Sequence, residues 1–155
     1  MSVNLLRVDI SAVDALVDGI EDKLLENARP AAQAGSEVLY QAVMRNVNAL
    51  GRKTGNLASA IYQAYSRSNS NANLGRATYH ISWNAKKAPH GHLVEHGHIQ
   101  KYKVYLGKDG KWYTNKKAPL PTPVQVAARP FIRPAVAEFP QAEAAMRERL
   151  LQGVA

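Results

Sequence analysis

Two prolines four residues apart, Pro130 and Pro134, divide the last third of this chain, and each directly follows an arginine. Proline fixes its own φ and biases the residue before it away from the α conformation, so the chain must enter this segment in an extended form. Phe131 and Ile132 lie between the prolines, which indicates a stretch that positions the next element of the chain. An amphipathic helix is predicted after Pro134, with apolar residues on one side: Val136, Phe139, Ala142, Met146, Leu150 and Leu151.

The length of the chain favours one folded unit. With 155 residues, 46% of them hydrophobic, it can bury one ordinary core but hardly a second, so we expect a single domain over 1–155.

The absence of cysteine excludes disulfides, thiolate catalysis and cysteine metal sites. The apolar runs fall far short of the roughly 20 residues that span a bilayer. The first residues lack the basic and apolar regions of a signal peptide, so we expect a protein that is cytosolic when made, with no membrane partner.

Charge is distributed unevenly along the chain. Residues 1–50 hold four Lys/Arg against seven Asp/Glu, residues 51–117 hold twelve against two, and residues 118–155 hold four against three. The basic middle predicts contact with phosphate groups or an acidic protein surface. Alternatively, its lysines keep exposed strands soluble and unpaired. The lysine-rich hairpin in this segment lacks the side chains expected of a sequence-specific binder, so sequence-specific DNA recognition is not predicted.

Residues 1–50 form a predicted helical N-terminal part. Ser11 is a candidate N-cap with Asp14 three residues later, and apolar residues recur at helical spacing to near Asn27, where we expect this helix to end. A second apolar stripe starts at Pro30 and ends near Leu50. A proline at this point either kinks one helix or separates a helical hairpin. Four acids on these helices predict a solvated face, with a cation site or an acidic docking strip as alternatives: Asp14, Asp18, Glu21 and Asp22.

The middle of the chain predicts two β-hairpins. The first joins residues 62–66 and 77–83, which are rich in Tyr, Thr, Ile and Trp, through a Ser/Asn-rich turn. The second is a protruding hairpin over residues 99–117, with a turn at the Asp109-Gly110 step. Three prolines make residues 118–134 a stiff extended arm. The order of elements predicts an α+β fold, with N-terminal helices and a C-terminal helix packed on an antiparallel β-sheet that carries a long β-hairpin.

Aromatic residues are concentrated in the predicted strands. They favour cross-strand pairing within the sheet, with stacking on nucleic-acid bases as the alternative. The set comprises Tyr62, Tyr65, Tyr79, Trp83, Tyr102, Tyr105, Trp112 and Tyr113.

A histidine cluster surrounds Glu95 and is the candidate that points most directly to chemistry. It comprises His90, His92, His96 and His98. On a helix, two of these would share a face at i and i+4, as in a zinc or nickel site. The zinc-protease helix has Glu directly after the first His, whereas Leu93 stands there, and Gly91 and Gly97 cut the segment short. No nucleophile accompanies the cluster, and no glycine-rich phosphate loop is present. We predict a short helical turn with Leu93 and Val94 in the core and Glu95 held by a basic neighbour.

Three short motifs occur in order: Thr54-Gly55-Asn56-Leu57, Val94-Glu95-His96-Gly97 and Arg129-Pro130-Phe131-Ile132-Arg133-Pro134-Ala135. This ordered trio resembles the neck and tail-completion family of long-tailed double-stranded DNA phages, which includes relatives of the lambda minor tail protein Z. The resemblance covers residues 10–152. The chain differs from relatives at His96-Gly97-His98, where an aromatic residue and a threonine more often flank the glycine, and in its long hairpin.

The resemblance implies a non-enzymatic virion protein that forms a ring, a hexamer, at the head-tail junction, surrounds the DNA channel and assembles in the host cytoplasm. It implies no catalytic residue, cofactor or metal, and neighbouring connector, terminator or tail-tube proteins as partners. A tail terminator or head-closure (stopper) ring is a close alternative. A stand-alone nucleic-acid-binding protein and a metal-dependent hydrolase are alternatives from other classes.

Two sets of residues are candidates for contacts in such an assembly. The hairpin and the proline-rich arm would reach neighbours, and Glu95 would form an ion pair with Arg129 or Arg133 within or between subunits. The predicted subunit and partner contacts are Glu95, Arg129, Phe131, Arg133, Tyr102, Tyr105 and Trp112. The lysines that would attract passing DNA without reading its sequence are Lys101, Lys103, Lys108, Lys111, Lys116 and Lys117.

Overall fold

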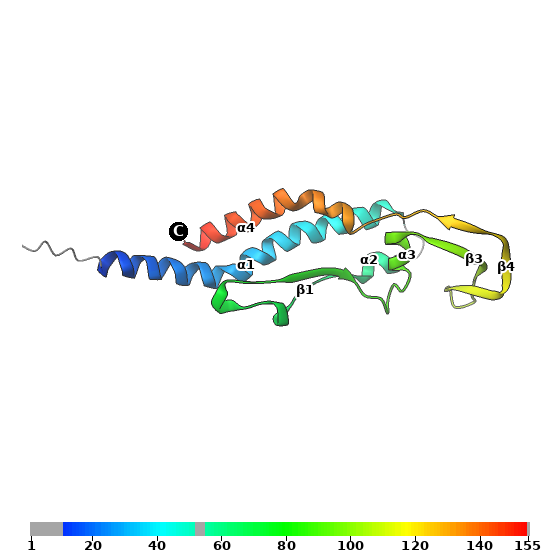
Figure 1. Ribbon diagram of the computed structural model, residues 1–155, viewed down its shortest axis with the longest axis horizontal. Helices are drawn as coiled ribbons and strands as arrows, with labels where there is room; N and C mark the ends of the chain where they lie inside the picture. The colour runs from blue at the N-terminus through cyan, green and yellow to red at the C-terminus, as the bar shows by residue number, and fades with distance from the viewer. Residues whose placement is uncertain (1–10, 52–54, 155) are drawn as a thin grey trace, which may run out of the picture. The chain divides into compact units, whose positions relative to one another are not determined.

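The computed structural model describes residues 11–51 and 55–154 of the chain (Figure 1). These residues divide into two compact units. One contains 11–41, 63–81 and 137–154, and the other contains 42–51, 55–62 and 82–136. Three elements have residues in both units, namely α1 (Ser11–Ala49), β1 (Ile61–Tyr65) and β2 (Tyr79–Trp83). The expectation of a single domain therefore stays a prediction.

Helix α1 settles the choice that Pro30 left open. It is one α-helix of 39 residues with Pro30 inside it, so the predicted end near Asn27 is wrong and there is no helical hairpin in this part of the chain. Asn27 and Gly35, on either side of Pro30, both contact the C-terminal helix, and this packing outweighs the loss of the hydrogen bond that proline removes. The predicted cap at Ser11 and the Asp14 side chain lie outside the residues whose side chains are described.

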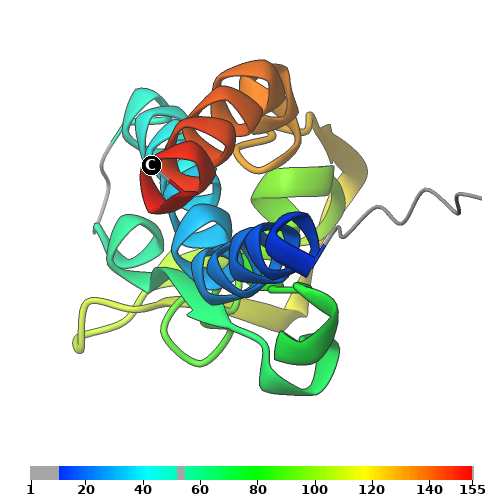
Figure 2. The same ribbon diagram turned by 90° about the vertical axis from the view of Figure 1, so that its left-hand side faces the viewer.

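The first unit is built on close contact between α1 and α4 (Phe139–Val154), which lie alongside each other in Figures 1 and 2. A Cβ added at Gly35 would meet Met146 and would lie 3.0 Å from the carbonyl oxygen of Ala142. Gly153 is equally close to Asn27, so the two helices run antiparallel. Small residues at these positions allow the helix backbones to approach closely.

The predicted first hairpin is present as the pair of strands β1 and β2. Its connection contains two 3-10 helices, η1 (Arg67–Asn69) and η2 (Ala72–Leu74). Tyr65 and Tyr79 contact each other with ring centroids 5.4 Å apart, and the Arg29 guanidinium lies 4.3 Å from the Tyr65 ring centre. This part of the tyrosine set therefore pairs within the protein.

The second unit contains α2 (Asn56–Ala60), α3 (Gly91–His96) and the long hairpin of β3 (His98–Leu106) and β4 (Trp112–Val126). Strand β4 extends to Val126, so the first part of the predicted arm 118–134 is a β-strand. The ladder is irregular on both sides of Tyr102, which pairs with Pro119. Pro121 and Pro123 fall in the interrupted stretch of β4, where their missing N–H groups cost no ladder hydrogen bond.

The fold is α+β, as predicted. It has a long N-terminal helix, a C-terminal helix and antiparallel strands, although the described strands form two separate two-stranded sheets, β1-β2 and β3-β4, rather than one sheet. The 3-10 helix η3 (Arg133–Glu138) leads from the Arg129–Ala135 motif directly into α4. Pro134 therefore lies in the first turn of a helical segment, a position that proline favours.

Candidate functional site

The carboxylate of Glu95 is the centre of a dense set of hydrogen bonds in the second unit, which we call the Glu95 site. One oxygen, Oε2, accepts the backbone N–H groups of Phe131 at 2.7 Å and Ile132 at 3.0 Å. The other, Oε1, accepts the backbone N–H of Arg133 at 3.2 Å and its side-chain Nε–H at 3.1 Å. Residues 131–133 are the three between the two prolines. Glu95 therefore binds every backbone N–H donor that the proline-bracketed segment offers.

Three further hydrogen bonds hold the segment around residues 131–133. The Arg133 guanidinium donates a 2.6 Å hydrogen bond to the carbonyl oxygen of Glu95, and the backbone N–H of Arg129 donates to the carbonyl oxygen of Val94 at 2.8 Å. The side chain of Asn46 on α1 donates to the carbonyl oxygen of Phe131 at 3.0 Å. These bonds fix the segment against α3 and the end of α1.

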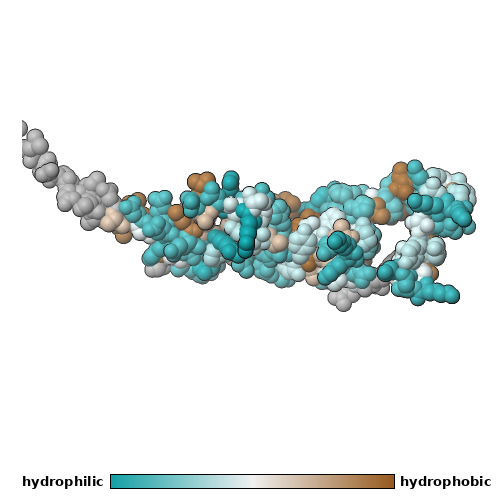
Figure 3. All heavy atoms as spheres, turned by 90° about the horizontal axis from the view of Figure 1, so that it is seen from below, coloured by the Kyte–Doolittle hydropathy of each residue, from teal (hydrophilic) through white to brown (hydrophobic). Residues whose placement is uncertain are grey.

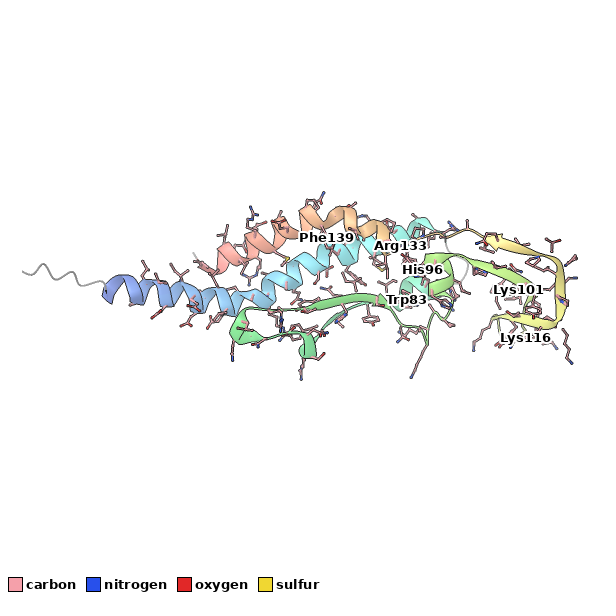
Figure 4. The ribbon with its side chains drawn as sticks, viewed as in Figure 1. Trp83, His96, Lys101, Lys116, Arg133 and Phe139 are labelled. Atoms are coloured by element: carbon pink, nitrogen blue, oxygen red, sulfur yellow. The ribbon has the colours of Figure 1, made fainter. Side chains whose placement is uncertain are left out.

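Phe131 is the hydrophobic anchor of the site. Its side chain is fully buried, and its ring contacts Trp83 edge-on with centroids 5.7 Å apart. Figure 4 shows Trp83, His96 and Arg133 in this region. Burying a phenylalanine contributes roughly 1.5–3 kcal/mol, so the ring and the carboxylate act together to place residues 131–133.

Electrostatics at Glu95 result from opposing effects. Burial by itself raises the pKa of a carboxyl group, but the hydrogen bonds from the amides of Phe131, Ile132 and Arg133 and from the Arg133 side chain outweigh it. The pKa of Glu95 is therefore held below its usual value, and the group is ionised at neutral pH. A charged, fully bonded carboxylate of this kind serves to hold structure and is not poised to transfer a proton.

The glycine of the second motif has a steric role. Gly97 has φ +73° and ψ 172°, a conformation that is essentially confined to glycine. A Cβ at this position would lie 2.7 Å from the carbonyl oxygen of Val126 and 2.8 Å from the backbone nitrogen of Ala128. Gly97 thus lets the chain leave α3 in close contact with the segment that leads to Arg129.

The three sequence motifs meet at one hollow of about 500 Å³ in the second unit. Gly55 and Leu57 come from the first motif, Val94 from the second and Arg129 from the third, and residues at the end of α1 complete the lining. Thr54 lies outside the described residues. The motifs are far apart in sequence, so their convergence explains why they occur together.

A family model matches residues 12–97 of the chain, which is more than half of its length. Its description is "Bacteriophage HK97-gp10, putative tail-component". The chain belongs to the HK97-gp10-like family. It is therefore a phage tail component and part of the virion. Searches of curated proteins and of solved structures found no match.

Residues Gly55–Leu57 and Val94–Gly97 of the first two motifs lie inside the range of this HK97-gp10-like chain that the family model matches. The third motif lies beyond residue 97, yet Glu95 binds its backbone directly. The Glu95 site thus joins the matched part to the C-terminal part. None of the described helices is long and apolar enough to cross a membrane.

The predicted contact residues fall into two groups. Glu95 and Phe131 are buried within the chain, so their side chains serve its own fold and do not present a surface to a partner. The candidate ion pair is an intrachain pair of Glu95 with Arg133, at 3.1 Å, while Arg129 donates to the carbonyl oxygen of Leu50 at 2.9 Å.

The second group lies on the hairpin and is exposed. Trp112 is 57% exposed and Tyr105 53%, while Tyr102 is 37% exposed. All six predicted channel lysines are exposed as well, and Figure 4 shows Lys101 and Lys116 on the two strands. In Figure 3, hydrophilic and apolar spheres lie side by side at this end of the second unit. Their roles as partner and DNA contacts stay predictions.

The histidine cluster takes the predicted short helical turn. Within residues 11–51 and 55–154, no group of three or more His, Asp or Glu side chains is arranged to hold a metal ion. Both Glu95 oxygens are already occupied by two donors each. Leu93 and Val94 were predicted to anchor this turn in the core, but both are only half-buried. The buried residue that anchors the turn is Glu95. His98 buries its Nδ1 without a hydrogen-bond partner among the described residues.

Sequence reasoning missed the role of Asn46. It stands between Val43 and Val47, which are buried, and a polar residue at helical spacing within an apolar stripe is the signal that could have identified it. The three backbone donors of residues 131–133 carry no such signal, because every non-proline residue has an N–H group.

Proposed function

We propose that this tail component is a non-enzymatic structural protein that forms a homohexameric ring at the head-tail junction, joins the tail to the head and surrounds the DNA channel. One observation carries the proposal. Glu95 and Phe131 of the motifs are buried and contact other residues of the same chain, whereas the hairpin presents its lysines and aromatic rings to solvent. Exposed aromatic rings are enriched at contact surfaces between proteins, and exposed lysines attract phosphate groups or an acidic surface.

A tail terminator or head-closure ring is the close alternative, since each of these would also use an exposed arm to reach a neighbouring ring. The alternatives differ in their partners. We expect a neck or tail-completion ring to bind both the head connector and the tail end, a terminator to bind the tail tube first, and a stopper to bind the head connector first.

The test is the mass of the purified protein, alone and mixed with the tail-tube and head-connector proteins of the same phage, measured by native mass spectrometry. We expect a closed hexamer, alone or on a partner, that binds both proteins. Binding to only one of them would favour a terminator or a stopper. A protein that stays monomeric and ignores both partners contradicts the proposal.

A genetic experiment tests the same proposal in the assembling phage. Removing the protein is expected to leave filled heads and tails that fail to join, visible by electron microscopy, and supplying it afterwards is expected to restore infectious particles. Normal virions without the protein would contradict a role at the junction.

The exposed lysines favour a second candidate function, non-specific DNA binding by the protein itself. It predicts tight binding by the monomer with a steep dependence on salt. Weak binding that becomes appreciable only in the assembled ring would instead support lysines that line a channel.

A further inference from the structure

The first turns of α1 have an apolar stripe that is largely exposed among the residues that the structure describes. Every residue from Ala15 to Leu24 is exposed. Helical spacing places four large apolar residues on one face, namely Leu16, Val17, Ile20 and Leu24, with exposures of 64%, 55%, 39% and 40%. A short stretch of helix without tertiary packing is marginal in water, so this stripe needs a partner.

The same turns are acidic. Helical spacing places Glu21 beside the stripe and Asp18 and Asp22 toward the opposite face, and all three are exposed. We call residues 15–26 the acidic helix end. A surface that suits it must offer apolar area together with positive charge.

The second unit has such a surface at the tip of its hairpin. A hollow of about 740 Å³, which we call the tip hollow, lies between the hairpin and the loop before α3. Val104 and Trp112 supply its apolar lining, and Lys86, Lys87 and Lys111 supply its charge. Both apolar side chains are about half exposed. The carboxylate near this lining, Asp109, accepts a 2.6 Å hydrogen bond from Tyr113 and lies 4.0 Å from Lys111.

Register separates the tip hollow from other lysines of the hairpin. The cross-strand partners Val104 and Thr114 share one face, as do Leu106 and Trp112. Lys103 pairs with Asn115 on the opposite face. Occupying the face of Val104 and Trp112 therefore leaves Lys103 free for other contacts, whereas Lys116 lies on the occupied face.

We propose that the acidic helix end of one copy binds in the tip hollow of the next copy. The apolar stripe covers Val104 and Trp112, and Glu21 beside it pairs with a lysine of the hollow. Asp18 and Asp22 add negative charge that Lys86, Lys87 and Lys111 attract at longer range. The two surfaces are different, so the contact is head-to-tail, and repetition of such a contact closes a ring or extends a filament. This inference rests on the proposed ring function and names the surfaces that close it.

Two charge-reversed full-length proteins test the contact. One carries Asp18→Lys, Glu21→Lys and Asp22→Lys, and the other carries Lys86→Glu, Lys87→Glu and Lys111→Glu. All six positions are exposed, so both proteins should fold as the wild type does, which circular dichroism and thermal melting would check. Each alone is expected to lose self-association by about tenfold or more. Mixed together, each helix end again meets a hollow of opposite charge, so assembly returns with the two proteins in equal amounts.

A matched control uses the other lysines of the hairpin. Lys101→Glu, Lys103→Glu and Lys117→Glu change the net charge by the same amount outside the tip hollow, and this protein is expected to assemble as the wild type does. Full assembly of the Lys86/Lys87/Lys111 variant by itself, or no recovery on mixing, overturns the inference. A wild-type ring that withstands both reversals leaves the proposed function standing. A wild type that never assembles, alone or with the head and tail proteins, overturns both.

Discussion

Glu95 is buried yet charged, and its carboxylate accepts hydrogen bonds from four donors, which stabilise the charge. In Glu95→Gln, one oxygen is replaced by an NH2 group that cannot accept, so two donors lose their partner. We expect a loss of about 3 kcal/mol in unfolding free energy, measured by urea denaturation. The control is Glu143→Gln, which breaks an exposed pair with Arg147 and should cost less than about 0.5 kcal/mol. Equal losses in the two variants would mean that the Glu95 bonds contribute little.

Acid should remove the same contribution. The pKa of Glu95 is lowered in the folded chain because its hydrogen bonds outweigh the effect of burial, whereas in the unfolded chain it stays near 4.5. The folded state therefore binds fewer protons, its extra stability is fully present above pH 4.5, and it is lost as pH falls through the lower folded pKa. We expect the stability difference between wild type and Glu95→Gln to shrink below pH 4.5 in a series of urea titrations. A difference that is constant from pH 7 to pH 3 would contradict the lowered pKa.

At the scale of elements, the exit from α3 depends on one glycine. Gly97→Ala would place a methyl group against the backbone of Val126 and Ala128, so we expect a loss of about 3 kcal/mol. Gly110→Ala is the matched control, because Gly110 has the same φ of +73° and nothing within 4 Å of an added Cβ. It should cost about 1 kcal/mol. Thermal unfolding of the two variants measures the difference, and similar melting temperatures would show that the backbone adjusts at Gly97.

The elements show which features a sequence can predict. The strand and turn residues of the hairpin 99–117 and the short helical turn at Glu95 were predictable, because turn chemistry and residue preference act locally. A basic partner for Glu95 was also predictable, from Arg133 in the third motif. The passage of α1 through Pro30 was not, because contacts of α1 with α4 override the local preference of proline. The interrupted pairing of β4 could not be predicted either, because the register depends on both strands together.

At the scale of the molecule, the uneven charge predicts how DNA is bound. Lysines on the hairpin outside the tip hollow are exposed, so they should neutralise phosphates without regard to sequence. We expect weak DNA binding whose logarithm falls linearly with the logarithm of salt concentration, with a slope of about 0.9 for each phosphate contacted. Replacing Lys101, Lys103, Lys116 and Lys117 with glutamine should lower that slope by about 3 to 4, measured by fluorescence anisotropy on two unrelated duplexes.

The control for this measurement is Lys86→Gln with Lys87→Gln, because these residues lie in the tip hollow and are expected to contact protein in the assembled ring. At protein concentrations where native mass spectrometry shows that the ring of this variant still forms, the pair should leave the salt slope unchanged, whereas the four-lysine variant should lower it. The reverse result would place DNA in the tip hollow and require a different contact between copies. A strong preference for one of the two duplexes would contradict phosphate binding as the origin of the affinity, because phosphates carry no direct sequence information.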